Sequence, residues 1–470
     1  MTAIIRTRPS FALLVSGGPR RLLAMLTIIA AATIALVAGF PGFAQQAAPP
    51  EPAATLFQNV RIFNGKSPTL SPPSSVLVRG NKIERISTGA ITPDANTRVI
   101  DGGGRVLMPG LIDDHWHTMF VRPTPPMLMA SDPGYINLLA GAEAEATLLR
   151  GFTTVRDLGG PSFSLKRAID EGLLPGPRIY PSGAMITITG GHGDFRTSND
   201  LPRAMGQMTH GEEVGGFALA DSPDEVRLRA REQLMQGATQ VKLTAGGGVA
   251  SPHSPLDVST FTLEELRAAV EAAENWGTYV CVHAYTPVAI QRAIQAGVKC
   301  IEHGHLMDEA TAKMIADKGV WLSTQPLLDM SMVAMLGPDQ QAQFAQVVEG
   351  TNNVYTYARK YHIKTAWGTD ILFSAAGARK QGQMIVDLMR WYTPAEALIM
   401  ATSTNAELLR MSGLRNPYPG ALGVVAQGAY ADLLLVDGNP LENLKLVADP
   451  DRSFVIIMKD GKIYKNTLPR

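Results

Sequence analysis

The stretch that decides the fold is Met108-Pro109-Gly110-Leu111-Ile112-Asp113-Asp114-His115-Trp116-His117. The apolar run over residues 106–112, broken at Pro109-Gly110, predicts a buried strand. His115 and His117 lie two apart at its carboxyl end, and residues i and i+2 of a strand point to the same face. Two neutral imidazoles that converge in this way form half of a site for a divalent transition metal.

Further residues of metal-binding types lie at the carboxyl ends of other predicted strands, namely Lys242, His283, His303 and Asp370. Taken singly, a strand-end histidine is more often a hydrogen-bonded structural residue. A single aspartate could cap the next helix, and a single lysine could reach solvent. Six such side chains, all at strand ends, are hard to explain by packing, so the sequence predicts a metal site.

The middle of the chain, residues 109–410, alternates short apolar strands with helical stretches. With the strand that ends at His117, the predicted strands number eight, the others being 153–156, 178–182, 240–244, 279–283, 298–303, 320–324 and 364–369. Eight strands with intervening helices predict an α/β fold, a (β/α)8 TIM barrel whose catalytic face is formed by the carboxyl ends of the strands. Thr262 and Glu265 are spaced as a capping box for a helix over 262–275. The insert 190–220, rich in Gly and Met, is predicted to be an irregular active-site loop.

Both chain ends are rich in β-type patterns. Residues 46–108 and 411–470 carry alternating apolar strands, with hairpin turns at Gly80-Asn81 and at Lys459-Asp460-Gly461-Lys462. We expect the two segments to form one small β-sandwich.

The N-terminus resembles a targeting segment. Four arginines precede an apolar run over residues 22–40, and Gly42-Phe43-Ala44 follows as a candidate cleavage site. This pattern predicts a signal peptide over residues 1–45 and a secreted or periplasmic protein without membrane contact after cleavage. An uncleaved membrane anchor is the alternative, since 19 apolar residues can span a bilayer.

Composition narrows the class of partner. The 470 residues carry 42 basic and 42 acidic side chains, a balance that argues against nucleic acid. Cys281 and Cys300 both lie in apolar, strand-like runs, which favours buried free thiols. A bridge between them remains an alternative at this stage.

The order His-x-His, Lys, His, His, Asp resembles the amidohydrolase superfamily in its binuclear subtype. Pro109-Gly110-Leu111-Ile112-Asp113, Ile301-Glu302-His303-Gly304 and Gly368-Thr369-Asp370 are specific to it, and the resemblance covers nearly all of the chain after the signal. Thr189-Gly190-Gly191-His192-Gly193-Asp194 and Gly246-Gly247-Gly248-Val249-Ala250-Ser251 are similar to the branch that contains Xaa-Pro dipeptidase-like carboxypeptidases and ochratoxin-hydrolysing amidohydrolases.

The resemblance implies a role for each ligand position. His115 and His117 would bind the more buried of two divalent ions, and His283 and His303 the more exposed one. Lys242 would carry a CO2-derived carbamate that bridges both ions, because burial favours the neutral amine that reacts with CO2. Asp370 would bind the first ion and exchange protons with a metal-bridging hydroxide. Zinc suits this ligand set, and manganese or cobalt could replace it.

The resemblance also implies an activity. The chain would be a metallo-amidohydrolase that cleaves an amide or peptide bond next to a C-terminal hydrophobic amino acid, as a carboxypeptidase or dipeptidase does, with ochratoxin-type amides among the candidates. Its partner would be a small amide or dipeptide, and relatives point to a homo-oligomer. Asp370 and His192 are the candidate catalytic residues. His192, His253 and Tyr285 are candidate substrate-binding residues, against the plainer interpretation as loop and rim residues. Arg156, at the end of the second strand, could form a structural ion pair or bind a substrate carboxylate, and the structural ion pair is favoured.

Two other functions stay open. A cyclic amide or lactone hydrolase of the imidazolonepropionase type would keep a single metal and lack the bridging lysine. A non-catalytic scaffold on the same fold would have lost ligands, whereas all six positions are filled here.

Overall fold

The computed structural model describes residues 54–201, 207–334 and 336–469, all within one compact unit, Pro52–Arg470. The predicted signal peptide, residues 1–45, lies outside the described residues. No helix in the described part of the chain combines the length and the apolar content that crossing a bilayer requires.

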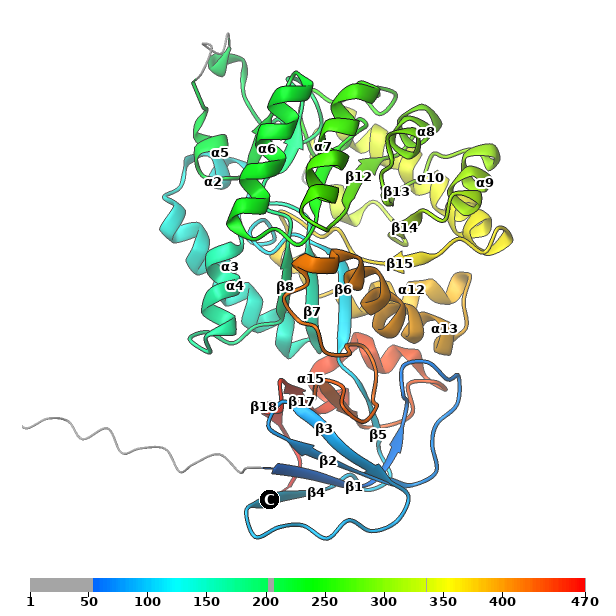
Figure 1. The fold of residues 1–470 in the computed structure, drawn as a ribbon. Helices are drawn as coiled ribbons and strands as arrows, with labels where there is room; N and C mark the ends of the chain where they lie inside the picture. Colours follow the sequence, from blue (N-terminus) through cyan, green and yellow to red (C-terminus); the bar gives the residue numbers. More distant parts are fainter. Residues whose placement is uncertain (1–53, 202–206, 335, 470) are drawn as a thin grey trace, which may run out of the picture. The chain divides into compact units, whose positions relative to one another are not determined.

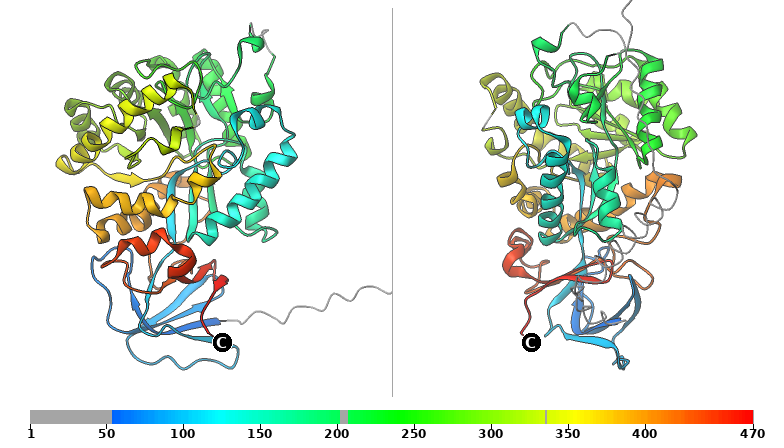
Figure 2. Two further views of the ribbon diagram at one scale, coloured as in Figure 1. Left: turned by 180° about the vertical axis from the view of Figure 1, so that it is seen from behind. Right: turned by 90° about the vertical axis from the view of Figure 1, so that its left-hand side faces the viewer.

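An eight-stranded sheet, called the chain-end sheet below, contains strands from both ends of the chain. Its order is β18-β17-β16-β5-β1-β2-β3, with β4 paired to β1. Figure 2 shows its N-terminal strands, in blue, beside its C-terminal strands, in red. The strands are β1 (Ala54–Ile62), β2 (Ser74–Arg79), β3 (Lys82–Ser87), β4 (Thr97–Asp101), β5 (Val106–Pro109), β16 (Leu433–Val436), β17 (Phe454–Lys459) and β18 (Lys462–Asn466). Both predicted hairpins are confirmed, because Arg79 pairs with Lys82 and Lys459 pairs with Lys462.

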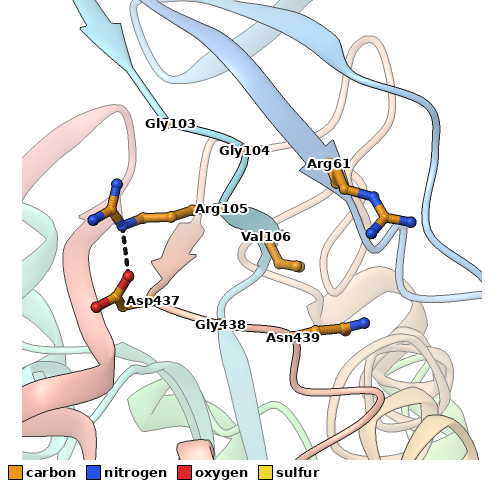
Figure 3. Close-up of a pocket in the computed structure, with 8 residues that line it drawn as sticks. All are labelled: Arg61, Gly103, Gly104, Arg105, Val106, Asp437, Gly438 and Asn439. Carbon is orange, nitrogen blue, oxygen red and sulfur yellow. Dashed lines mark hydrogen bonds and ion pairs between the residues drawn. The ribbon is translucent and has the colours of Figure 1, made fainter.

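A side-chain ion pair adds to the pairing between β5 and β16. Arg105, just before β5, places its Nε 2.8 Å from Asp437 Oδ1, just after β16 (Figure 3). Both side chains are partly exposed, so water screens the pair and it stabilises the sheet little. The paired backbones of the two strands hold most of this junction together.

The single strand predicted over residues 106–112 is wrong. The structure has two strands here, β5, which pairs with β1 and β16, and β6 (Leu111–Trp116), which pairs with β7. The change of sheet falls at Pro109-Gly110, since proline lacks a backbone N–H and a side chain at Gly110 would collide with Thr153. The dipeptide therefore passes the chain from the chain-end sheet to the strand that carries His115.

Parallel strands make up the middle of the chain and confirm the predicted α/β class. They form a three-stranded sheet, β6-β7-β8, and a seven-stranded sheet, β10-β9-β11-β12-β13-β14-β15. Their bounds, after β6, are β7 (Phe152–Asp157), β8 (Arg178–Pro181), β9 (Met185–Thr187), β10 (Phe217–Leu219), β11 (Val241–Thr244), β12 (Val280–Ala284), β13 (Cys300–His303), β14 (Trp321–Thr324) and β15 (Thr365–Trp367). Every residue of β12 and β13 is buried, as expected for parallel strands with covered faces.

Helices connect these strands, and α6, α7 and α8 follow one another outside the seven-stranded sheet (Figure 1). The helices are α2 (Pro125–Ala130), α3 (Pro133–Leu149), α4 (Phe163–Asp170), α5 (His210–Glu213), α6 (Pro223–Gln236), α7 (Leu263–Asn275), α8 (Pro287–Ala296), α9 (Glu309–Asp317), α10 (Pro338–Lys360), α11 (Ala375–Ala378), α12 (Gln381–Asp387), α13 (Pro394–Ile399), α14 (Asn405–Leu409) and α15 (Pro450–Ser453). The predicted capping box is confirmed, since the Thr262 side chain accepts from Glu265 N and the Glu265 side chain accepts from Thr262 N.

The insert over residues 190–220 is more regular than predicted. It contains the short helix α5 and the strand β10, which pairs with β9. The strand was missed because Phe217-Ala218-Leu219 is too short for a periodic pattern to stand out. The loop between β9 and α5 nevertheless carries His192.

Candidate metal centre

The parallel strands bring five of the predicted ligand positions to their carboxyl ends. His115 lies in β6, His283 in β12 and His303 at the end of β13, while His117 follows β6 and Asp370 follows β15. All four histidines are buried, and the Asp370 side chain keeps a quarter of its surface exposed. The histidines of the cluster are therefore shielded from solvent, and solvent reaches the cluster at the Asp370 carboxylate.

His115, His117 and Asp370 form a group that could hold a metal ion, with one ligand atom from each within 4.8 Å of the others. Asp370 Oδ1 lies 2.9 Å from His117 Nε2 and 3.2 Å from His115 Nε2. Two ring nitrogens and a carboxylate oxygen that converge in this way match the donors that zinc and similar cations accept in proteins.

The other two histidines extend this group. The ring centroid of His303 lies 4.9 Å from that of His115 and 4.4 Å from that of His283. His303 Nδ1 lies 3.9 Å from the second Asp370 oxygen, Oδ2. The Asp370 carboxylate thus stands between the His115–His117 pair and His303.

Hydrogen bonds fix how the rings are turned. His115 Nδ1 lies 2.9 Å from Glu302 Oε2, and His303 Nδ1 lies 2.8 Å from Gln325 Oε1. Each ring donates its Nδ1–H to these acceptors, so Nε2 is left for a ligand, which is the usual arrangement around a metal. His283 instead uses Nε2 for the Gly247 carbonyl oxygen, at 2.8 Å.

The electrostatics of the cluster favour the ligand forms of its groups. Burial lowers the pKa of His283 and His303 well below the ordinary value, so both rings are neutral at physiological pH. Burial alone would raise the pKa of Asp370, but His115 and His117 hold it well below its usual range. Neutral imidazoles beside an ionised carboxylate can bind a cation without first losing protons.

Two of these residues have an unusual backbone. His303 has a φ of +77° and Asp370 a φ of +55°, in the left-handed region that residues other than glycine rarely adopt. Such conformations cost energy and persist where the surrounding structure imposes them, often at functional sites. At these two strand ends, the turn aims the side chain into the cluster.

Lys242, in β11, is buried beside the same cluster. A positive charge on Lys242 would help to lower the pKa of His117, His192, His283 and His303, so the side chain lies within electrostatic reach of all four rings. Among the residues that the structure describes, no carboxylate lies within ion-pair distance of it. A buried lysine among neutral histidines is unusual for a purely structural residue.

A buried charge network behind His115 was not predicted as part of the site. Arg156 Nη2 lies 2.8 and 3.0 Å from the two Glu302 oxygens, and 3.0 Å from Asp114 Oδ2 without hydrogen-bond geometry. Burial opposes ionisation of Glu302, yet Arg156 and His115 hold its pKa well below the usual range, whereas burial raises that of Asp114 well above it. This agrees with the structural ion pair expected of Arg156. Glu302 could have been found as the one carboxylate in the predicted strand 298–303.

We expect Arg156→Met to lower the free energy of unfolding by about 3–5 kcal/mol, because it leaves Glu302 charged and buried without its partner. Chemical denaturation monitored by circular dichroism measures the loss. The matched control is Arg167→Met, since Arg167 pairs with Glu171 in an exposed i,i+4 bridge, and its loss should cost less than about 0.5 kcal/mol. Equal losses in the two variants would contradict a stabilising role for the buried network.

The three candidate substrate residues differ in placement. His192 and Tyr285 both lie next to His283, with ring centroids 4.3 and 4.8 Å from that of His283. Burial lowers the pKa of His192 to about 4, so its ring is neutral. His253 is exposed on the loop after β11 and takes part in none of these ring contacts, so its role remains a prediction. Both cysteines are free and buried.

The chain has an α/β fold with a His/His/Asp group at the carboxyl ends of its parallel strands, and the comparison of its sequence with protein families agrees with these two features. The model of the amidohydrolase family matches residues 106–465, and the chain belongs to that family.

Three proteins that are similar to this chain have more specific names than the family. The ochratoxinase of Aspergillus niger is 30% identical over 383 residues, which are 77% of this chain and 76% of that protein. A prolidase crystallised with N-methylphosphonate-L-proline has a TM-score of 0.81 at 33% identity, over 88% of this chain and all of that one. A Xaa-Pro dipeptidase with methionine bound in its active site has a TM-score of 0.76 at 29% identity, also over 88% of this chain and all of that one.

Proposed function

We propose that this chain is a metal-dependent hydrolase that cleaves an amide or peptide bond next to a C-terminal hydrophobic amino acid. The observation that carries the proposal is the convergence of His115, His117 and Asp370, with ligand atoms within 4.8 Å of one another, beside His283 and His303. The ochratoxinase, prolidase and dipeptidase relatives support the type of bond.

We further propose that eight parallel strands close into a (β/α)8 barrel over residues 109–410, with a β-sandwich built from 46–108 and 411–470. Two backbone hydrogen bonds support closure where no strand ladder runs. Thr239 N, before β11, donates to Pro181 O in β8, and Asp370 N, after β15, donates to His115 O in β6, both at 2.8 Å. In such a barrel the catalytic residues lie at the carboxyl ends of the strands.

The residues present fit two divalent cations. His115, His117 and Asp370 would hold one, and His283 and His303 the other, with a carbamate on Lys242 between them. The donor set supports this fit, because the Nε2 atoms of His115 and His117 both face Asp370 Oδ1, and imidazole nitrogens with a carboxylate oxygen are the donors that such cations take. When bound, two such cations lower the pKa of a shared water and polarise the scissile carbonyl.

The chain's own residues supply the remaining chemistry. Asp370 is placed to accept a proton at Oδ2 and to pass it to the leaving nitrogen, because its carboxylate is ionised and partly exposed. His192 and Tyr285, whose rings both lie next to that of His283, are placed to donate hydrogen bonds to the substrate's carbonyl or carboxylate oxygens.

An aromatic cluster beside the centre supports a substrate with an apolar group. The rings of His117 and Phe120 lie 6.0 Å apart, Phe120 and Phe373 6.4 Å, and Phe373 and Phe195 5.9 Å. Phe195 and Phe373 are only partly buried, so they offer an apolar wall near the metal ligands. Such a wall suits a hydrophobic side chain better than a charged one.

A hydrolysis screen tests the proposal. The zinc-loaded protein is assayed on N-acyl amino acids, Xaa-Pro dipeptides and ochratoxin A, with ninhydrin or chromatography reporting the released amine. We expect turnover of linear amides that end in an apolar residue, loss of turnover after chelation and recovery on adding zinc. Turnover of cyclic amides or lactones alone would contradict the proposal.

A further inference from the structure

His192 is held from one side by Ser251. The Ser251 hydroxyl lies 3.1 Å from His192 Nδ1, and the His192 ring centroid lies 4.3 Å from that of His283, with the two rings tilted by 31°. Gly248 lies close to the same ring, since a Cβ at that position would collide with it. Two loop residues that the chemistry described so far does not use, Gly248 and Ser251, therefore lie against one imidazole.

The single hydroxyl proton of Ser251 determines which residue is the donor in the hydrogen bond between Ser251 and His192. Ser251 is buried, and its Oγ accepts the backbone N–H of Gly193 at 2.7 Å. Its single hydroxyl proton then needs an acceptor, and among the described residues His192 Nδ1 is the one within reach. If His192 Nδ1 carried the proton instead, the buried hydroxyl would accept two bonds and donate none, which is unfavourable. The hydroxyl therefore donates to Nδ1.

The other ring nitrogen must then carry the hydrogen of the neutral imidazole. His192 Nε2 makes no hydrogen bond to a described residue, and the residue as a whole is only partly buried. It is therefore available as a donor beside His283.

We propose that Ser251 is a positioning residue that holds His192 as the Nε2–H tautomer, so that this N–H donates to the oxygen of the scissile carbonyl. The inference rests on the proposed hydrolase function. A donor fixed before the reaction stabilises the charge that develops on that oxygen more than one that must first change tautomer. Replacing a residue that fixes the tautomer of a histidine in this way typically lowers activity by about 10- to 100-fold.

Nitrogen NMR of the zinc-loaded, ¹⁵N-histidine-labelled protein reads the tautomer directly, with His192→Asn assigning the signals. We expect the Nε2–H tautomer in the wild type, a mixture in Ser251→Ala and recovery in Ser251→Thr. Ser254→Ala is the matched control. Ser254 is buried in the same loop and accepts a backbone N–H, that of Gly248, but makes no hydrogen bond to His192. It should leave the tautomer unchanged.

Kinetics supply a second readout. We expect Ser251→Ala to lower kcat by about 10- to 100-fold, with KM changed less than about threefold. In a His192→Asn background the same substitution should have no further effect, because the two residues act through one hydrogen bond. Independent, multiplying losses or an unchanged tautomer in Ser251→Ala would overturn the proposal. A zinc-loaded wild type that holds the Nε2–H tautomer but hydrolyses nothing in the screen would instead overturn the proposed function, and the donor role with it.

Discussion

Asp370→Asn is expected to lower kcat/KM for amide hydrolysis by about 10³- to 10⁴-fold. The carboxylate oxygen Oδ1 lies 2.9 Å from His117 and 3.2 Å from His115, so it is placed both to bind a cation and to accept a proton. An amide keeps a similar shape, but it binds cations weakly and cannot take the proton. Steady-state assays on the best substrate of the screen measure the loss.

The matched control for Asp370→Asn is Asp437→Asn. Asp437 also accepts one ion-pair contact, from Arg105, but it lies at the chain-end sheet (Figure 3). We expect its activity to stay within about twofold of the wild type, since exposed ion pairs contribute little. A tenfold loss or less in Asp370→Asn, at full metal content, would show that another residue moves the proton.

Lys242→Ala is expected to reduce bound metal from about two ions per chain to about one or fewer, with a loss of activity of at least about 10³-fold. The lysine is buried near four histidines, without a carboxylate partner among the described residues. If it bridges two ions as a carbamate, the alanine variant loses a ligand to each. Mass spectrometry of the metals in the dialysed protein counts them.

Lys459 provides the control for this substitution. It is also buried, and burial lowers its pKa, but it lies at the end of β17 in the chain-end sheet. We expect Lys459→Ala to keep the metal content and activity of the wild type, even if losing this lysine lowers the stability of the protein. Two ions retained in the Lys242→Ala protein would show that this lysine does not hold the metals. One ion in the wild type, unchanged in the variant, would favour a mononuclear centre of the kind found in cyclic amide hydrolases.

Much of the fold could be predicted because its signals are local. Parallel strands buried on both faces are short apolar runs, and Tyr279 to His283 is one of them, so their existence follows from composition. Where each strand ends is also local, because the polar residue that interrupts the run is the one that reaches the shared edge. His283, His303 and Asp370 were predicted as candidates for that reason.

Features that depend on contacts between distant residues could not be predicted. The break at Pro109-Gly110 separates two sheets only because Thr153, in another strand, fills the space above Gly110. Ser251 is an ordinary loop serine until folding brings it to His192, 59 residues away. Glu302 likewise gains its role from Arg156 and His115, which lie on two other strands.

The most direct test of the account is an anomalous-scattering crystal structure of the zinc-loaded protein. The account predicts two peaks per chain, one among His115, His117 and Asp370 and one beside His283 and His303, with extra density on Lys242 Nζ. A single peak, or peaks away from these side chains, would contradict it.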